Sequence, residues 1–125
     1  VVDHIHALDK TVVLHICGDT TKNLPFIAAT GIDWLSLDQK LDLATAKNMI
    51  GDQVGLIGNV DPVNIILQGT PAAIDADVKR CFEEAYDTPK GFCIGPGCSV
   101  PYFTPEQNID AFMQASRKYA GEYLQ

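Results

Sequence analysis

The sequence lacks the features that would place the protein on a nucleic acid or in a membrane. Nine basic residues stand against sixteen acidic ones in 125, a net charge of −7. This balance argues against nucleic acid or an anionic lipid surface, because both select a basic face. No apolar run approaches the roughly 20 residues of a membrane helix, and no signal-peptide pattern opens the chain. We therefore expect no nucleic-acid partner, no membrane and a cytoplasmic location.

Cysteine is scarce and irregularly spaced. Four cysteines, at positions 17, 81, 93 and 98, form neither paired CxxC knuckles nor a secreted disulfide framework. The chain also has no Walker motif, no GxSxG and no HExxH. Reduced thiols in an intracellular protein are the better interpretation. Cys81, on the apolar side of a predicted helix, and Cys93, inside a predicted strand, are expected in the core.

Apolar runs of strand length alternate with amphipathic stretches of helix length. Strands are predicted over Thr11 to Cys17, Asp33 to Asp38, Val54 to Val60 and Gly91 to Gly95. Helices are predicted over 1–9, 20–30, 41–50, 62–68, 71–86 and 105–123. Two of them have a readable core-facing stripe: Ile74, Val78, Cys81, Phe82 and Ala85 in one, and Ile109, Phe112, Met113, Ser116 and Ala120 in the other.

Helix starts and stops are marked by specific residues. Asp61, Thr70 and Thr104 each precede a proline and are predicted N-caps. Gln107 stands three residues after Thr104, which is the spacing of a capping box. Glycines are predicted to end helices at positions 31, 51, 69 and 121.

The alternation of strands and helices predicts an α/β fold with a parallel sheet and right-handed crossovers. Four βα units make a small open sheet or half of a (β/α)₈ TIM barrel, which usually takes about 250 residues. The chain opens with Val1-Val2-Asp3, without Met and inside a predicted helix. This opening favours the half-barrel, so we expect residues 1–125 to be a single partial domain of a longer chain.

Three soft metal ligands are predicted at the carboxyl ends of these strands. His15 and Cys17 are two residues apart and point to the same face. Cys98 follows the last predicted strand, and Asp38 and Asn59 end or nearly end the middle two. Parallel α/β proteins place their sites at this edge. One histidine and two cysteines suit Zn²⁺, with a fourth position left for a carboxylate, water or substrate.

The same residues also have a plain structural interpretation. A histidine pointing inward from a strand is often a hydrogen-bonded core residue, and a lone cysteine after Gly95-Pro96-Gly97 is often a turn residue. An HxC pair alone is a weak signal. The convergence of three soft ligands on one edge favours the metal site.

Five segments resemble the uroporphyrinogen decarboxylase superfamily and, more narrowly, its corrinoid-dependent branch, the methylcobamide:coenzyme M methyltransferases. They are LHICGDTT (14–21), LSLDQK (35–40), GNVDP (58–62), GTP (69–71) and GPGCSVPYFTPEQNIDAF (95–112). The resemblance runs from about residue 11 to about residue 120 and corresponds to the C-terminal part of the family's (β/α)₈ barrel. The HxC pair with the later GC is its specific part, because the decarboxylase branch uses no metal and lacks this pair.

The resemblance implies a zinc site. His15, Cys17 and Cys98 match the family's zinc ligands. Related zinc thiol-methyltransferases have a further carboxylate ligand about two dozen residues after the histidine, where this chain has Asp38. Asp38 is either that ligand or an acceptor for the His15 ring N–H. Asn59 is expected to line the barrel mouth and contact the substrate.

The resemblance also implies a reaction. Two thiolates and a neutral imidazole cancel the charge of Zn²⁺, so a bound substrate thiolate stays electron-rich. It would take a methyl group from a methylcorrinoid carried on a partner corrinoid protein, with coenzyme M as one such thiol. The alternatives are a metal-free porphyrinogen decarboxylase relative and a non-catalytic half-barrel. The isolated fragment is expected to be inactive and to self-associate through its open edges and uncovered apolar face.

Overall fold

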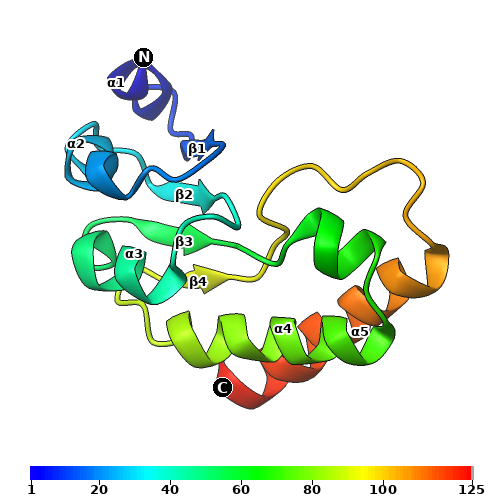
Figure 1. Ribbon diagram of the computed structural model, residues 1–125. Helices are drawn as coiled ribbons and strands as arrows, with labels where there is room; N and C mark the ends of the chain where they lie inside the picture. The colour runs from blue at the N-terminus through cyan, green and yellow to red at the C-terminus, as the bar shows by residue number, and fades with distance from the viewer. Residues whose placement is uncertain (125) are drawn as a thin grey trace.

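Four parallel strands form one sheet in the order in which they occur along the chain (Figure 1). The computed structural model describes residues 1–124. The strands are β1 (Val13–Ile16), β2 (Trp34–Leu37), β3 (Gly55–Ile57) and β4 (Phe92–Cys93). The order β1-β2-β3-β4 has no reversal, whereas doubly wound sheets reverse direction at a switch point. The predicted α/β fold, with four βα units of the barrel type, is confirmed.

Each predicted helix has a counterpart, although several are shorter. The 20–30 stretch is divided, because Pro25 takes a position in the first turn of a new helix. The helices are α1 (Val2–His6), the 3₁₀ turn η1 (Thr21–Asn23), α2 (Leu24–Ala28), α3 (Leu43–Ile50), the π-helix η2 (Pro62–Leu67), α4 (Pro71–Ala85) and α5 (Glu106–Tyr123). None of the helices in residues 1–124 is both long and apolar enough to cross a membrane.

Two of the three predicted N-caps are confirmed. The Asp61 carboxylate accepts the backbone N–H groups of Val63 and Asn64, and the Thr70 hydroxyl accepts that of Ala73. The capping box at Thr104 is wrong, because the Thr104 hydroxyl instead donates to the backbone carbonyl of Pro101. The stop predicted at position 121 is also wrong, since α5 continues to Tyr123.

One predicted helix stripe is confirmed in full and the other in part. All five stripe residues of α4 are buried, as predicted. In α5 the predicted face is confirmed in part: Ser116 is buried and Phe112 and Ala120 pack against the core. Ile109 and Met113 are 36% and 42% exposed. The buried residues of α5 are Asn108, Ala115, Ser116 and Tyr119.

The two faces of the sheet have different surroundings. Leu35 and Leu37 of β2 belong to the buried core on one face. On the other face Val13 is 56% exposed, and Cys93, predicted in the core, is also exposed. An open hollow of about 330 Å³ lies there against Val13, Trp34, Ile57 and Cys93. The alternation of β1 and β2 therefore gives one packed face and one largely bare face.

Trp34 explains a glycine on the bare face. Its indole ring lies against Gly55 of the neighbouring strand, where a Cβ atom would come within 2.5 Å of the ring. Only glycine leaves room for the indole at this position. The ring covers part of this face next to His15, on the side toward the amino-terminal ends of the strands.

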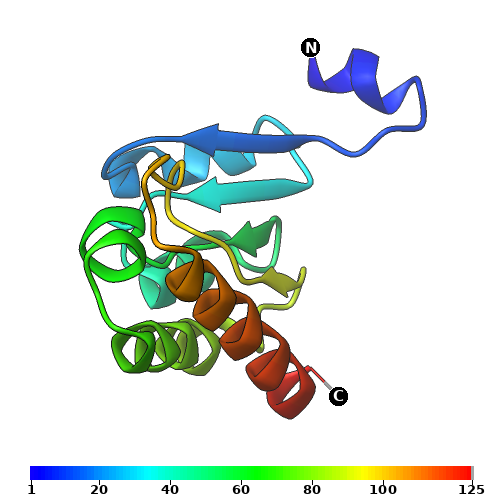
Figure 2. The ribbon, with the colours of Figure 1, turned by 90° about the vertical axis from the view of Figure 1, so that its right-hand side faces the viewer.

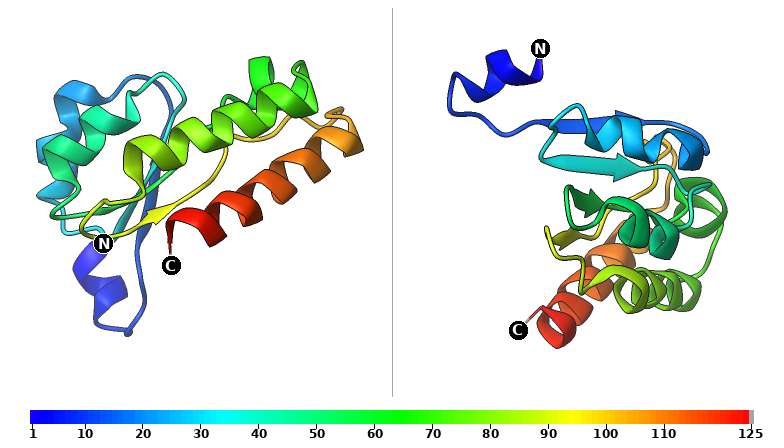
Figure 3. Two further views of the ribbon diagram at one scale, coloured as in Figure 1. Left: turned by 90° about the horizontal axis from the view of Figure 1, so that it is seen from below. Right: turned by 90° about the vertical axis from the view of Figure 1, so that its left-hand side faces the viewer.

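Helices α4 and α5 run side by side in the same direction (Figure 3, left). The Tyr119 hydroxyl of α5 donates to the Asp75 carboxylate of α4 over 2.7 Å, and Lys118 Nζ donates to the same carboxylate over 3.2 Å. The Tyr119 hydroxyl and the Lys118 ammonium hold the pKa of Asp75 below its ordinary value.

The change Tyr119→Phe is expected to lower the free energy of unfolding at pH 7 by about 1–2 kcal/mol, because a hydrogen bond to a charged carboxylate is lost. Since folding lowers the pKa of Asp75, its stabilising contribution is present at neutral pH and is lost as the pH falls through the folded-state value. The variant should therefore lose less stability on acidification than the unsubstituted protein. Urea titrations at pH 7 and pH 3 measure both effects, and equal acid losses in the two proteins would contradict the assignment.

Candidate metal centre

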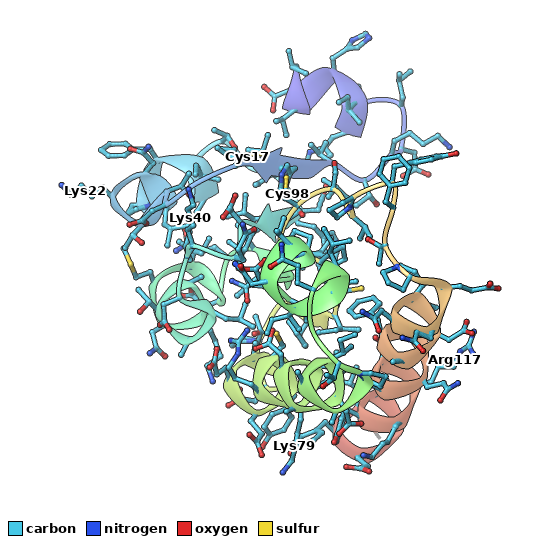
Figure 4. All side chains as sticks on the ribbon, turned by 45° about the vertical axis from the view of Figure 1, so that its right-hand side comes forward. Cys17, Lys22, Lys40, Lys79, Cys98 and Arg117 are labelled. Carbon is cyan, nitrogen blue, oxygen red and sulfur yellow. The ribbon has the colours of Figure 1, made fainter. Side chains whose placement is uncertain are left out.

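The structure brings together the three ligands predicted from the sequence. His15 is in β1 and Cys17 follows that strand directly, while Cys98 comes from the segment after β4, which reaches the carboxyl end of β1 (Figures 2 and 4). His15 Nε2 lies 3.3 Å from Cys17 Sγ, and the Sγ atoms of Cys17 and Cys98 are 3.6 Å apart. All three ligand atoms lie within 4.8 Å of one another.

Ser36 orients the imidazole of His15. His15 Nδ1 lies 3.2 Å from the backbone carbonyl oxygen of Ser36 and 3.1 Å from its hydroxyl. Because a carbonyl oxygen only accepts, Nδ1 carries the proton and Nε2 keeps its lone pair. Nε2 is the nitrogen that faces Cys17. Metal-binding histidines are commonly held in this way by the second ring nitrogen.

Two of the three separations between these atoms come close to those around a tetrahedral zinc ion. Zn–S bonds of about 2.3 Å and Zn–N bonds of about 2.05 Å give S···S and S···N separations of about 3.8 and 3.6 Å at the tetrahedral angle. The observed separations are 3.6 and 3.3 Å. Thiolate and imidazole are also the ligands that zinc prefers. The residues present therefore fit zinc, with one position left open.

The neighbouring Cys98 hinders the ionisation of Cys17. The hydrogen bond that Cys17 shares with Cys98 and the charge of the Cys98 thiolate both raise the pKa of Cys17 above its ordinary value. Two neighbouring thiolates need a cation to be charged together. By contrast, burial raises the pKa of Cys81 to about 11, as expected of a core cysteine.

Asp38 does not join the ligand atoms. Its Oδ2 accepts the backbone N–H of Gly18 over 2.7 Å, and its Oδ1 accepts that of Lys40 over 2.8 Å. Both oxygens already have a partner, and the side chain is not a member of the candidate ligand group. The alternative role, as acceptor for the His15 ring, is taken by Ser36. These contacts indicate that the Asp38 carboxylate binds backbone N–H groups and not a metal ion.

Asn59 is buried beneath the edge and does not line the mouth. It is 2% exposed. Its Nδ2 donates to the backbone carbonyls of Asp38 over 3.1 Å and Leu41 over 2.6 Å. These bonds use both amide hydrogens, so the contacts of Asn59 indicate a structural role in place of the predicted substrate contact.

Sequence reasoning missed two parts of the site. Ser36 is the partner of His15 in the β1–β2 register. Predicting each strand separately from the sequence does not show which residues pair across two strands. A pocket of about 290 Å³ adjoins the ligands and is lined by His15, Ser36, Ile57, Gly95, Pro96, Cys98 and Ser99. The Gly-Pro-Gly run before Cys98 was the sequence signal for a rigid wall here.

The fold and the site define a class of protein: a parallel α/β domain of the barrel type with a histidine and two cysteines gathered at its carboxyl edge. Comparison with known families makes this specific. The model of the uroporphyrinogen decarboxylase (URO-D) family matches residues 1–119. The chain belongs to this family.

Individual relatives come from both branches of the family. The chain is 35% identical over 119 residues to the methylcobamide:CoM methyltransferase MtbA of Methanosarcina acetivorans, which covers 95% of this chain and 33% of that protein. It is 35% identical over 107 residues to a uroporphyrinogen decarboxylase of Pseudoalteromonas atlantica, which covers 82% of this chain and 29% of that protein. Identity alone therefore does not separate the branches.

A solved structure shows the same fold. A methyltransferase from Methanosarcina mazei superimposes with a TM-score of 0.81 at 29% identity, covering 94% of this chain and 34% of that chain. The sequence thus spans about a third of the length of the relatives it matches.

Proposed function

We propose that this chain is part of a zinc-dependent methyltransferase that moves a methyl group from a methylated corrinoid to a small thiol such as coenzyme M. The observation that carries the proposal is the group of His15 Nε2, Cys17 Sγ and Cys98 Sγ within 4.8 Å at the carboxyl edge. The similarity to methylcobamide:CoM methyltransferases supports the substrates.

The side chains of this segment would hold and orient the reacting thiol. Bound zinc would supply the charge that keeps a substrate thiol ionised at neutral pH. His15, Cys17 and Cys98 would hold the zinc, and Ser36 would keep the Nε2 lone pair of His15 available. The open pocket beside Cys98 would offer the carbon chain of the thiol an apolar surface that includes Ile57 and Pro96.

The transfer itself balances without a further reactant. The carbon–sulfur bond forms as the cobalt–carbon bond breaks, the electron pair of that bond stays on cobalt, and the thiol proton passes to solvent. The corrinoid protein would dock at the carboxyl edge, where Cys17 is exposed. Reduced thiols at the site are consistent with a cytoplasmic protein.

The rest of the site would come from the part of the protein that the relatives have in addition. The bare face of the sheet, with Val13 exposed, is the side on which further strands would complete a barrel. We propose that residues 1–125 are the C-terminal half-barrel of such a protein. On its own this segment should be inactive and should self-associate, which sedimentation would show.

The test uses the intact, undenatured full-length enzyme. We expect about one zinc per chain by elemental analysis, and loss of the methylcobalamin absorption spectrum when coenzyme M is added. Absence of zinc would overturn the proposal. Identity to decarboxylases makes a metal-free porphyrinogen decarboxylase the second candidate, and release of CO₂ from uroporphyrinogen by a zinc-free enzyme would establish it.

A further inference from the structure

The separation of the two cysteines depends on segments far apart in the sequence. Cys17 and Cys98 are 81 positions apart, yet their sulfur atoms are 3.6 Å apart. Residues 38–40, directly after β2, connect to the backbone beside each cysteine, and we call them the β2 loop. Figure 4 shows Lys40 of this loop on the same side of the molecule as the two cysteines.

Asp38 fixes the Cys17 side. Its Oδ2 accepts the N–H of Gly18, the residue after Cys17, over 2.7 Å, and its Oδ1 accepts the N–H of Lys40 over 2.8 Å. The side chain is 5% exposed, so water competes little for these bonds. Gly18 has a φ of 87°, a left-handed conformation that suits glycine.

Gln39 fixes the Cys98 side by close packing. A Cβ atom on Gly97, the residue before Cys98, would lie 2.4 Å from Gln39 N. The backbones of Gly97 and Gln39 are therefore in direct contact. Gly97 N–H also donates to the Val60 carbonyl over 2.8 Å, so this backbone cannot shift freely.

Asn59 anchors the β2 loop from below. Its amide donates to the carbonyls of Asp38, the first residue of the loop, and Leu41, the residue directly after it, over 3.1 and 2.6 Å. The loop is thus held at both ends, on a residue that is itself buried. A rigid spacer between the two cysteine-bearing segments is the result.

We propose that the β2 loop sets the distance between Cys17 and Cys98, with Asp38 as a positioning residue and not a metal ligand. The inference rests on the proposed function only in naming zinc as the metal; the distance between the two cysteines does not depend on it. Loss of a hydrogen-bond partner behind a metal ligand typically costs 10–100-fold in metal affinity. A purely structural Asp38 would lower stability and leave the cysteine pair unchanged.

Asp38→Asn is the first variant, with Asp42→Asn as its matched control. An amide in place of the Asp38 carboxylate turns an NH₂ group toward one of two backbone N–H donors. Asp42 also accepts a backbone N–H, that of Thr45 over 2.7 Å, but it caps α3 and touches neither cysteine segment. In the full-length protein we expect zinc affinity to fall 10–100-fold for Asp38→Asn and to change less than about twofold for Asp42→Asn.

A second readout needs no metal. In metal-free protein, diamide takes two hydrogens from neighbouring thiols and leaves a disulfide, and mass spectrometry of peptides measures the rate for Cys17–Cys98. We expect this rate to fall at least fivefold in Asp38→Asn and to stay unchanged in Asp42→Asn. Unchanged zinc affinity and an unchanged disulfide rate in Asp38→Asn would overturn the inference. If the unsubstituted protein binds no zinc but the disulfide rates differ as expected, only the proposed function fails.

Gly97→Ala tests the other side of the loop and replaces Asp38→Asn should that variant not fold. The new methyl group would push the Cys98 segment from Gln39, so zinc affinity and the Cys17–Cys98 disulfide rate should both fall. Gly121→Ala is its control, because a Cβ there meets no atom within 4 Å. Equal behaviour of the two alanine variants would overturn the inference.

Discussion

Replacing Cys98 by serine should lower the zinc affinity of the full-length protein by more than about 100-fold. This exceeds the roughly 10–100-fold effect of losing a group that only supports a metal ligand through a hydrogen bond. The reason is the donor set: a serine hydroxyl stays protonated where a thiol becomes a thiolate, so the site loses a charge and a soft ligand. Cys17→Ser should have the same effect, because Cys17 would supply the other sulfur ligand, 3.6 Å from that of Cys98. Competition with a chromophoric chelator measures the affinity.

Cys93 provides the matched control for both substitutions. It is also exposed, on the same face of the sheet and in the register row of Ile57, but it does not belong to the ligand group. Cys93→Ser should leave zinc content and affinity unchanged. If all three serine variants bind zinc equally well, the metal is held elsewhere and the assignment of the centre is wrong.

The sequence was sufficient to predict that His15, Cys17 and Cys98 come together, because the strand topology brings them to one edge. Parallel strands end at one edge, so residues that follow β1 and β4 had to share that edge. His15, Cys17 and Cys98 were found by this rule. Proximity to the edge did not reveal the roles of Asp38 and Asn59, because both bind backbone groups of loops whose paths no periodicity predicts.

For the helices too, features set by the local sequence were predicted and features set by contacts with distant segments were not. The face of α4 was predicted because its stripe packs over the sheet, and an apolar stripe turns to the core. In α5 the buried face is set by a neighbour: Tyr119 bonds Asp75 of α4, and Asn108 donates to the carbonyl of Ile66. The buried face of α5 thus includes polar residues while Ile109 and Met113 stay partly exposed, which apolar periodicity alone could not indicate.

Thr104 failed as a cap for a comparable reason. The spacing to Gln107 was correct for a capping box, but the Pro101 carbonyl lies within reach of the Thr104 hydroxyl and takes its hydrogen bond. Threonine hydroxyls bond equally well to a nearby turn as to a helix end. The long segment between β4 and α5 supplies that competing acceptor.

The largest loss of stability is expected for Phe82→Ala. Phe82 is fully buried on α4. Its ring makes an edge contact with Phe92 of β4 at 5.4 Å between centroids and stacks on Tyr123 of α5 at 5.9 Å. Removing it takes away aromatic contacts of α4 with both α5 and the sheet, and leaves a cavity. We expect the free energy of unfolding to fall by about 3–5 kcal/mol, and Tm by roughly 10–20 °C.

Phe103→Ala makes the same chemical change without the burial. Phe103 is 85% exposed and contacts the equally exposed Tyr102, so its loss should change stability by less than about 0.5 kcal/mol. Thermal denaturation followed by circular dichroism compares the two variants directly. Because both variants lose one phenyl ring, the difference between their Tm values reports the effect of packing and not that of the change in composition. Similar Tm values for the two would mean that α4 does not join α5 to the sheet through Phe82.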